Sequence, residues 1–233
     1  MQFDSRLTAI AEVTPTVKSF ALSLEGGHID FSPGQYIDLF IDAPGFDGAA
    51  GYSITSTPLE RGAISIAVKK LPEAKFTIYL HEEAKVGERF YLVGPGGDFY
   101  YREEMGNSLA LIAGGIGITP LMSMIRYVND ARLDASVTLL YSARVPSELA
   151  FYDELRRIEA ANPNIRCRFT VTQPQDEPWD GRVGRIDLEM MREHITNKES
   201  LFYICGPSEL PADIKQSLRE LGVDDSRVHA EEW

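Results

Sequence analysis

The most regular pattern of hydrophobic and polar positions lies at the centre of the chain. Residues 109–113 are five consecutive apolar residues, a short run typical of a buried parallel strand. After a glycine-rich turn, Leu121, Ile125 and Val128 recur at the spacing that places them on one face of a helix. The stretch therefore predicts a strand, a turn and a helix, in that order.

The turn carries three glycines and leads into the start of the helix. Gly114, Gly115 and Gly117 permit backbone conformations and close ligand approaches that a side chain would prevent. Thr119 is expected to cap the helix, and Pro120 suits its first position because the missing N–H needs no partner. Free N–H groups at a helix start attract phosphate, so this stretch indicates a seat for a dinucleotide pyrophosphate. A tight turn without a ligand is the alternative.

Before this stretch, the chain shows alternating, β-branched segments separated by turn residues. Six strands in under 100 residues indicate a small antiparallel six-stranded β-barrel. The expected strands are 6–13, 17–24, 36–41, 52–56, 63–70 and 89–93, with one helix at 76–83 and an exposed loop at 42–51.

After Gly106, apolar runs alternate with helical segments. This order predicts a five-stranded parallel sheet with helices on both faces, an α/β domain. The expected strands are 108–113, 136–141, 165–171, 201–205 and 226–231, and the helices are 119–131, 148–161, 187–195 and 208–221. The boundary lies near 98–107, which gives two domains, 1–102 and 103–233.

Composition narrows the class of protein. The 233 residues carry a formal net charge of −12 and no basic stripe, so a nucleic-acid partner is not expected. No run of eighteen apolar residues predicts a membrane span, and the N-terminus lacks the pattern of a secretory signal. Two cysteines, Cys167 and Cys205, cannot form a disulfide framework, and no histidine pair has metal-ligand spacing. A reduced, cytoplasmic location and no metal site are expected.

Six short motifs, in this order, make the chain resemble the ferredoxin–NADP reductase superfamily. Each is weak alone, but together they cover nearly the whole chain. The motifs are the turn 31–36 (FSPGQY), Tyr52-Ser53, the segment 94–99 (GPGGDF), the glycine turn 113–120, the turn Cys205-Gly206-Pro207, and the C-terminal 229–233 (HAEEW). The resemblance implies a flavin-binding barrel followed by a nucleotide-binding α/β domain.

The resemblance also implies which barrel residues bind the flavin. Tyr52 would pack on the ring, Ser53 would act as a catalytic hydroxyl near its reactive nitrogen, and the Ile54 and Thr55 backbones would meet its edge. Thr77, with the N–H groups of the helix that starts near Ala74, would hold the phosphate. Val68, Lys69 and Trp233 complete the expected flavin contacts.

Two positions depart from the family pattern. Ala50 stands where relatives carry an arginine that pairs with the flavin pyrophosphate, and Ala74 stands where they often carry glycine. A charge-assisted contact of that kind is worth about 1.5–3 kcal/mol. Three cations could replace it: Lys69, Lys70 and Arg102. FAD is the expected flavin, and FMN stays open.

In the second domain, the resemblance places the pyrophosphate of NADPH or NADH on the glycine turn with Thr119 and Pro120. Arg144 follows a strand end, where ligands of open α/β sheets bind, and could pair with a 2′-phosphate. Cys205, Gly206 and Pro207 would lie beside the nicotinamide, with Glu231 as a further catalytic residue.

Taken together, these features predict a flavin-dependent NAD(P)H oxidoreductase that passes electrons to a ferredoxin or to the iron–sulfur component of an oxygenase. Two alternatives stay open. The first is a free flavin reductase with loosely bound flavin, which the alanines at 50 and 74 favour. The second is a non-catalytic electron-transfer subunit that binds nucleotide.

Overall fold

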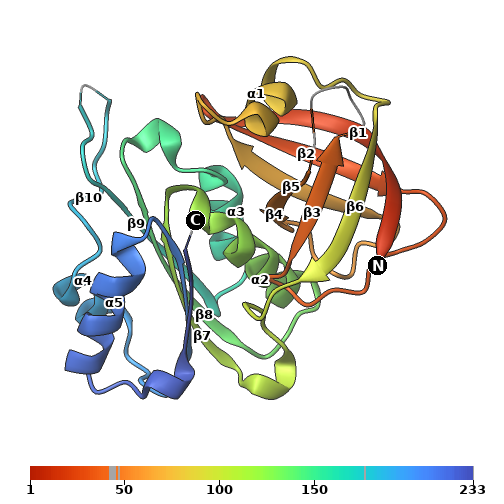
Figure 1. Ribbon diagram of the computed structural model, residues 1–233. Helices are drawn as coiled ribbons and strands as arrows, with labels where there is room; N and C mark the ends of the chain where they lie inside the picture. Colours follow the sequence, from red (N-terminus) through yellow and green to blue (C-terminus); the bar gives the residue numbers. More distant parts are fainter. Residues whose placement is uncertain (42–45, 47, 176, 233) are drawn as a thin grey trace.

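The first half of the chain forms a six-stranded antiparallel sheet that closes into a barrel (Figure 1). The computed structural model describes residues 1–41, 46, 48–175 and 177–232. The strands are β1 Gln2–Thr14, β2 Val17–Leu24, β3 Tyr36–Ile41, β4 Ala50–Ser53, β5 Ala63–Lys69 and β6 Arg89–Gly96. They lie in the order β4-β3-β6-β1-β2-β5, and a bridge between Ile54 and Ile66 joins the two ends of the sheet.

Alternation of side chains along these strands builds the barrel core. Phe20 and Leu22 of β2, and Ile37 and Leu39 of β3, point inward and are almost completely buried. The short helix α1, Lys75–Glu82, buries Leu80 against the same core. The predicted six-stranded barrel is thus confirmed.

The second half forms a parallel sheet of six strands in the order β10-β9-β8-β7-β11-β12. Its strands are β7 Ser108–Gly114, β8 Ser136–Ala143, β9 Ile165–Val171, β10 Arg182–Val183, β11 Leu201–Gly206 and β12 Val228–Glu232. Its helices are α2 Ile118–Asp130, α3 Tyr152–Ala161, α4 Leu188–His194 and α5 Glu209–Glu220. Short 3₁₀ helices are η1 Glu103–Met105, η2 Gly115–Gly117, η3 Pro146–Glu148 and η4 Asp225–Arg227.

Helices cover both faces of this sheet, as its continuous apolar strands require. On β7, Leu109 and Leu111 pack with α2 and α3, whereas Ala110 and Ile112 pack with α4 and α5. The strand is therefore buried on both sides, and its carboxyl end is held firmly at the glycine turn.

Three expectations need correction. The parallel sheet has a sixth strand, β10, whose two residues are too short to give a hydrophobic period. The predicted helix 148–161 begins only at Tyr152, because Phe151 adopts a left-handed conformation with φ of 61°. Five of the ten positions of the loop expected at 42–51 lie outside the described residues, and its last two positions belong to β4.

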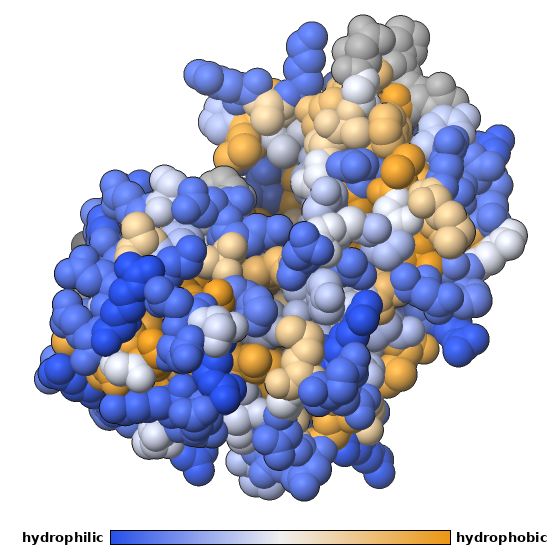
Figure 2. Space-filling view, turned by 60° about the horizontal axis from the view of Figure 1, so that its bottom comes forward, coloured by the Kyte–Doolittle hydropathy of each residue, from blue (hydrophilic) through white to orange (hydrophobic). Residues whose placement is uncertain are grey.

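Hydrophilic residues cover most of the surface seen in Figure 2, as expected for an acidic chain. Over the described ranges, no helix is both long and apolar enough to cross a bilayer. Within the same ranges, no group of three acidic, histidine or cysteine side chains could hold a metal ion.

Candidate functional site

A cavity of about 420 Å³ lies between the barrel and the α/β domain. Eight of the residues predicted from the sequence line it: Tyr52, Ser53, Val68, Lys69, Thr77, Thr119, Cys205 and Glu231. Six further residues complete its wall: Tyr36, Gly51, Ala67, Leu71, Ile116 and Glu232. The fold thus brings distant motifs of both domains to one place.

Tyr52 lines this cavity and carries a buried polar group without a partner in the described part of the chain. It lies on β4, opposite Ile37 of β3, and its buried phenolic oxygen has no hydrogen-bond partner among the described residues. Burial raises the pKa of the phenol to about 12, so it remains a proton donor. A buried donor without a partner is costly, which points to a ligand that accepts its hydrogen bond.

The residues after Ser53 turn away from the cavity. The N–H of Thr55 donates to the Ser65 carbonyl at 2.7 Å, and the Thr55 carbonyl accepts from Arg126 Nη1 at 2.6 Å. The N–H of Ile54 donates to the Gln35 carbonyl at 2.9 Å. The predicted flavin contacts at Ile54 and Thr55 therefore fall on groups that the protein itself already uses.

Helix α1 also differs from the expectation. Ala74 is its N-cap and offers no side-chain cap, and Ala74 does not line the cavity. The Thr77 hydroxyl accepts the Leu71 N–H at 3.0 Å and lies 3.0 Å from the Ala74 carbonyl oxygen, to which it donates. This hydroxyl organises the turn before the helix, so a phosphate would meet the first-turn N–H groups instead.

Cys205 and Glu231 lie side by side on two neighbouring parallel strands. They are paired in register between β11 and β12, at the carboxyl ends where α/β sheets bind ligands. Burial, with a smaller contribution from Glu231, raises the pKa of the Cys205 thiol, so the sulfur stays protonated. Burial also raises the pKa of the Glu231 carboxyl. The pair thus places a protonated thiol and a carboxyl with a raised pKa beside the cavity.

The glycine turn packs so closely against the turn after β11 that side chains at Gly114 and Gly117 would clash with it. A Cβ on Gly117 would lie 2.2 Å from the Cys205 carbonyl oxygen, and one on Gly114 would lie 2.9 Å from Leu210 Cδ2. Gly206 meets the same leucine at 2.6 Å. These glycines let the turns after β7 and β11 pack closely, and the predicted approach of a ligand to the same backbone stays a prediction. Gly115 adopts φ of +55°, a backbone conformation that residues with side chains rarely take.

The expected cap of helix α2 is wrong. The helix begins at Ile118 with Gly117 as N-cap, and no side chain caps it. The Thr119 hydroxyl, inside the first turn, donates to the Ile116 carbonyl at 2.9 Å. Pro120 is buried one position further along, where its missing N–H is still without consequence.

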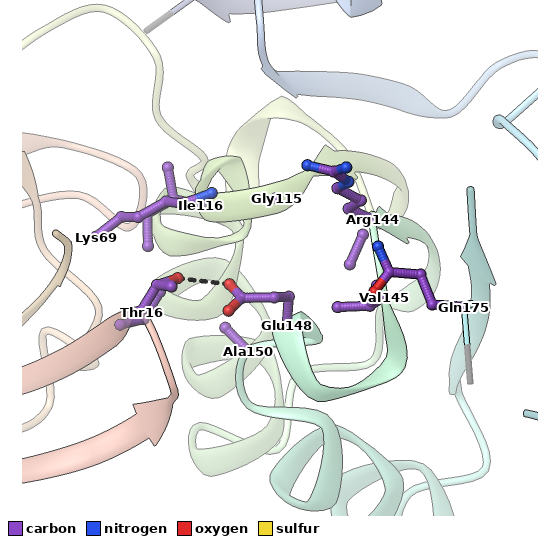
Figure 3. Close-up of a pocket in the computed structure, with 11 residues that line it drawn as sticks. Thr16, Lys69, Gly115, Ile116, Arg144, Val145, Glu148, Ala150 and Gln175 are labelled. Carbon is purple, nitrogen blue, oxygen red and sulfur yellow. Dashed lines mark hydrogen bonds between the residues drawn. The ribbon is translucent and has the colours of Figure 1, made fainter. Parts of the chain in front are cut away.

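A second cavity of about 350 Å³ adjoins the first and is lined by Gly115, Arg144 and Lys69 among the predicted residues (Figure 3). Thr16, from the turn of the barrel, donates to Glu148 Oε2 at 2.5 Å across the cavity. Arg144 donates through Nε to Gln173 Oε1 at 3.0 Å. Lys69 and Ile116 border both cavities.

The three candidate replacements for the missing arginine differ in their surroundings. Lys70 forms an ion pair with Glu82 at 2.6 Å, and Arg102 donates to Ser32 Oγ at 3.0 Å. Among the described groups, Lys69 has no such partner, and it alone of the three lines the two cavities where the domains meet, since Arg102 lines a separate one beside Ser32. The geometry therefore favours Lys69.

The remaining predicted residues are placed as follows. Gly114 and Gly206 are buried, Pro207 is exposed, and none of the three lines either cavity. Trp233 lies outside the described residues. Sequence reasoning missed Thr16, Glu148 and Tyr36. For Tyr36, the aromatic position of the FSPGQY motif was a usable signal, whereas Thr16 and Glu148 meet across a sequence separation of 132 residues.

Comparison with known proteins identifies both halves of the chain. An oxidoreductase FAD-binding domain model matches residues 4–101, and an oxidoreductase NAD-binding domain model matches residues 111–216. The flavohemoglobin-like FAD/NAD-binding domain of nitric oxide dioxygenase from Vibrio cholerae superposes with a TM-score of 0.88 at 26% identity, covering 99% of this chain and 98% of that one.

Two relatives are similar to this chain in sequence. Oxidoreductase NAD-binding domain-containing protein 1 of Danio rerio is 36% identical over an alignment of 256 residues, gaps included. The alignment covers 99% of this chain and 92% of that protein. The glycine betaine monooxygenase reductase subunit of Chromohalobacter salexigens is 32% identical over 208 residues, or 87% of this chain. The match covers only 56% of that subunit's length.

Proposed function

The chain belongs to the ferredoxin–NADP reductase superfamily of FAD- and NAD-binding oxidoreductases, and on this premise we propose that it is an NAD(P)H-dependent flavin oxidoreductase serving a redox partner protein. We also propose the domain limits 1–102 and 103–233, which enclose the two matched spans. The observation that carries the function is the cavity where Tyr52 and Ser53 of the barrel meet Cys205 and Glu231 of the α/β domain.

The residues present fit FAD. The cavity offers an apolar wall at Val68 and Leu71, and the buried Tyr52 phenol needs an acceptor that the described residues do not supply. An aromatic ring system with polar edges and a ribityl chain meets both requirements. When bound, FAD accepts a hydride from NAD(P)H and gives up its electrons singly.

The chain's own residues prepare the site for this chemistry. Ser53 lines the cavity, and its hydroxyl has no partner among the described residues, so it can hydrogen-bond a ring nitrogen. The protonated Cys205 thiol and the Glu231 carboxyl flank the place where the two domains meet. They orient the nicotinamide and exclude water, while the protein backbone fixes their spacing.

Charge at the phosphates comes from two cations. Lys69 stands between the cavities and replaces the family's arginine, since Ala50 cannot supply charge. Arg144 lines the second cavity opposite the barrel, where it would meet the adenosine ribose of NADH or the 2′-phosphate of NADPH. Exchange of Arg144 for Gln would then raise the KM for NADPH more than that for NADH.

The partner is the least defined part of the proposal. The relative from Chromohalobacter salexigens is named as the reductase subunit of a monooxygenase. By analogy, we propose that electrons leave this chain for an iron–sulfur protein, either a ferredoxin or an oxygenase component.

The test begins with the visible absorption spectrum of the purified protein, after incubation with FAD and removal of the excess. A flavin spectrum that bleaches on anaerobic addition of NADH or NADPH supports the proposal. Subsequent addition of an iron–sulfur acceptor should restore the spectrum. A protein that retains FAD but is bleached by neither nucleotide would contradict it.

A free flavin reductase is the second candidate. The replacement of the family's arginine by Ala50 leaves Lys69 as the cation that lines the cavity among the described residues, which favours weaker retention of the flavin. Gel filtration distinguishes the two, because loosely bound flavin separates from the protein and turnover then depends on its concentration.

A further inference from the structure

Helix α2 contacts both domains along its length. Its first turn carries Thr119, which lines the cavity between the domains. One turn later the buried Ser123 hydroxyl donates to the Ser56 carbonyl of the barrel at 2.7 Å. Arg126 follows, and its Nη1 donates to the Thr55 carbonyl at 2.6 Å. Helix α2 therefore donates hydrogen bonds to two successive backbone carbonyls of the barrel, those of Thr55 and Ser56.

Arg126 is itself held in one orientation. Its Nε and Nη2 donate to the two carboxylate oxygens of Glu154 on α3, at 2.7 and 2.8 Å. Its guanidinium also lies over the Phe151 ring, 5.2 Å from the ring centre. The left-handed backbone of Phe151, with φ of 61°, directs the chain so that helix α3 starts beside it. A bidentate pair of this kind fixes the plane of the guanidinium.

The barrel segment that receives these bonds continues directly from Tyr52 and Ser53. Thr55 is also tied to β5, because its N–H and its hydroxyl both donate to the Ser65 carbonyl, at 2.7 and 3.1 Å. In return, the Ser65 N–H donates to Ser56 Oγ at 3.0 Å. Both backbone and side chains thus prevent this segment from moving independently of the barrel.

The distances along the helix are short. At about 1.5 Å of rise per residue, Ser123 lies about 6 Å and Arg126 about 10 Å beyond Thr119. A helix of this length behaves as a rigid rod, so a shift at the two carbonyls is transmitted to the cavity wall. The same helix begins at the glycine turn, whose contacts with β11 also position Cys205.

We propose that Arg126 and Ser123 are positioning residues, which set the spacing between the flavin site on the barrel and the nicotinamide site on the α/β domain. The inference rests on the proposed function, because it concerns the alignment of two rings. Neither side chain lines the cavity of the proposed flavin site. An error of about 1 Å in such an alignment can slow a reaction about 100-fold.

The test compares four variants of the full chain loaded with FAD. Arg126→Met removes every side-chain donor, Arg126→Lys restores one charged nitrogen in place of three, and Ser123→Ala removes the hydrogen bond to the Ser56 carbonyl. Arg219→Met is the matched control, because Arg219 also pairs with a carboxylate, that of Asp225, but lies on the surface within one domain. The bond from Thr16 to Glu148 remains in all four and continues to join the domains.

The first readout is single-turnover bleaching of the flavin by NADH and by NADPH. We expect the maximal rate of Arg126→Met to fall about 10- to 100-fold, with FAD and nucleotide affinities within about 3-fold of the wild type. Arg126→Lys should recover part of the rate, Ser123→Ala should show a smaller loss, and Arg219→Met should match the wild type. A maximal rate of Arg126→Met within about 2-fold of wild type, or a loss explained by flavin release, would overturn the proposal.

The second readout needs no cofactor. In the flavin-free protein, the amides of Thr55 and Ser65 should exchange hydrogen faster in Arg126→Met than in Arg219→Met. Unchanged exchange would show that the bonds from Arg126 do not fix the barrel segment. If the wild type is bleached by neither nucleotide, the proposed function fails, while this comparison still decides whether Arg126 fixes the barrel segment.

Discussion

Exchange of Gly117 for Ala tests how tightly the two turns at the site are interlocked. The added methyl would lie 2.2 Å from the Cys205 carbonyl oxygen, 2.5 Å from its carbonyl carbon and 2.7 Å from the Gly206 nitrogen. All three are backbone atoms, so no side chain can rotate away. Gly117 has φ of −60°, which alanine adopts readily, so the clash alone accounts for the effect.

The size of the effect follows from two opposing contributions. Overpacking against an immobile backbone costs about 3 kcal/mol, at the upper end of measured values. Alanine recovers about 0.5 kcal/mol, because it restricts the unfolded chain. The net loss of about 2.5 kcal/mol corresponds to a fall in Tm of about 5–10 °C for a chain of this size.

Thermal unfolding followed by circular dichroism measures this change. Gly27→Ala is the matched control, since no atom lies within 4 Å of its added methyl and its φ lies outside the left-handed region. We expect Gly27→Ala to unfold within about 1 °C of the wild type. If Gly117→Ala unfolds at the same temperature as this control, the interlocking of the two turns is not as tight as described.

Four further predictions follow from individual groups. Because burial raises the pKa of the Glu231 carboxyl, the folded state binds its proton more tightly than the unfolded state, and ionisation weakens the fold. Glu231→Gln should therefore increase the free energy of unfolding in urea at neutral pH, with an advantage that disappears below a pH of about 4; a pH-independent difference would contradict this. Burial raises the pKa of both thiols, so iodoacetamide should modify Cys167 and Cys205 only after unfolding; rapid labelling of the native protein at mildly alkaline pH would show the opposite. Thr77→Val should cost about 1–3 kcal/mol in urea unfolding because it strands the Leu71 N–H, whereas Thr77→Ser should be nearly neutral. Lys69→Met should weaken FAD or nucleotide binding about 10-fold by titration, and Lys70→Met, which only breaks a surface pair with Glu82, should not; equal effects would remove Lys69 from the site.

The elements that could be predicted are those with a clear period. The apolar run of β7 and the helical spacing of α2 both appear where the sequence indicates them. The start of α2 could not be placed correctly. Gly115–Gly117 form a 3₁₀ turn that runs into the helix, so Thr119 falls inside the first turn rather than at its cap. Propensities of single residues do not reveal such continuity.

The candidate site was predictable where a motif recurs in the family, as with Tyr52, Cys205 and Glu231. The contacts between the domains were not predictable. Arg126 and Glu148 lie on α/β elements with ordinary helical or turn patterns, and their partners Thr55 and Thr16 are 71 and 132 residues away. Nothing in the local sequence distinguishes such a residue from a solvent-exposed one, because only the packing of the domains defines it.

Lys69 and Ile116 each border both cavities, so the two binding sites share a wall. A ligand in one cavity that moves these side chains, or neutralises the charge of Lys69, changes the free energy of binding in the other cavity. Thermodynamic linkage then requires reciprocity: if an occupied first cavity alters affinity in the second by some factor, the second alters the first by the same factor. We therefore expect FAD to change the affinity for NAD⁺ by the same factor as NAD⁺ changes the affinity for FAD, as titrations of each with and without the other will measure. Lys69→Met should reduce the coupling energy between the two sites.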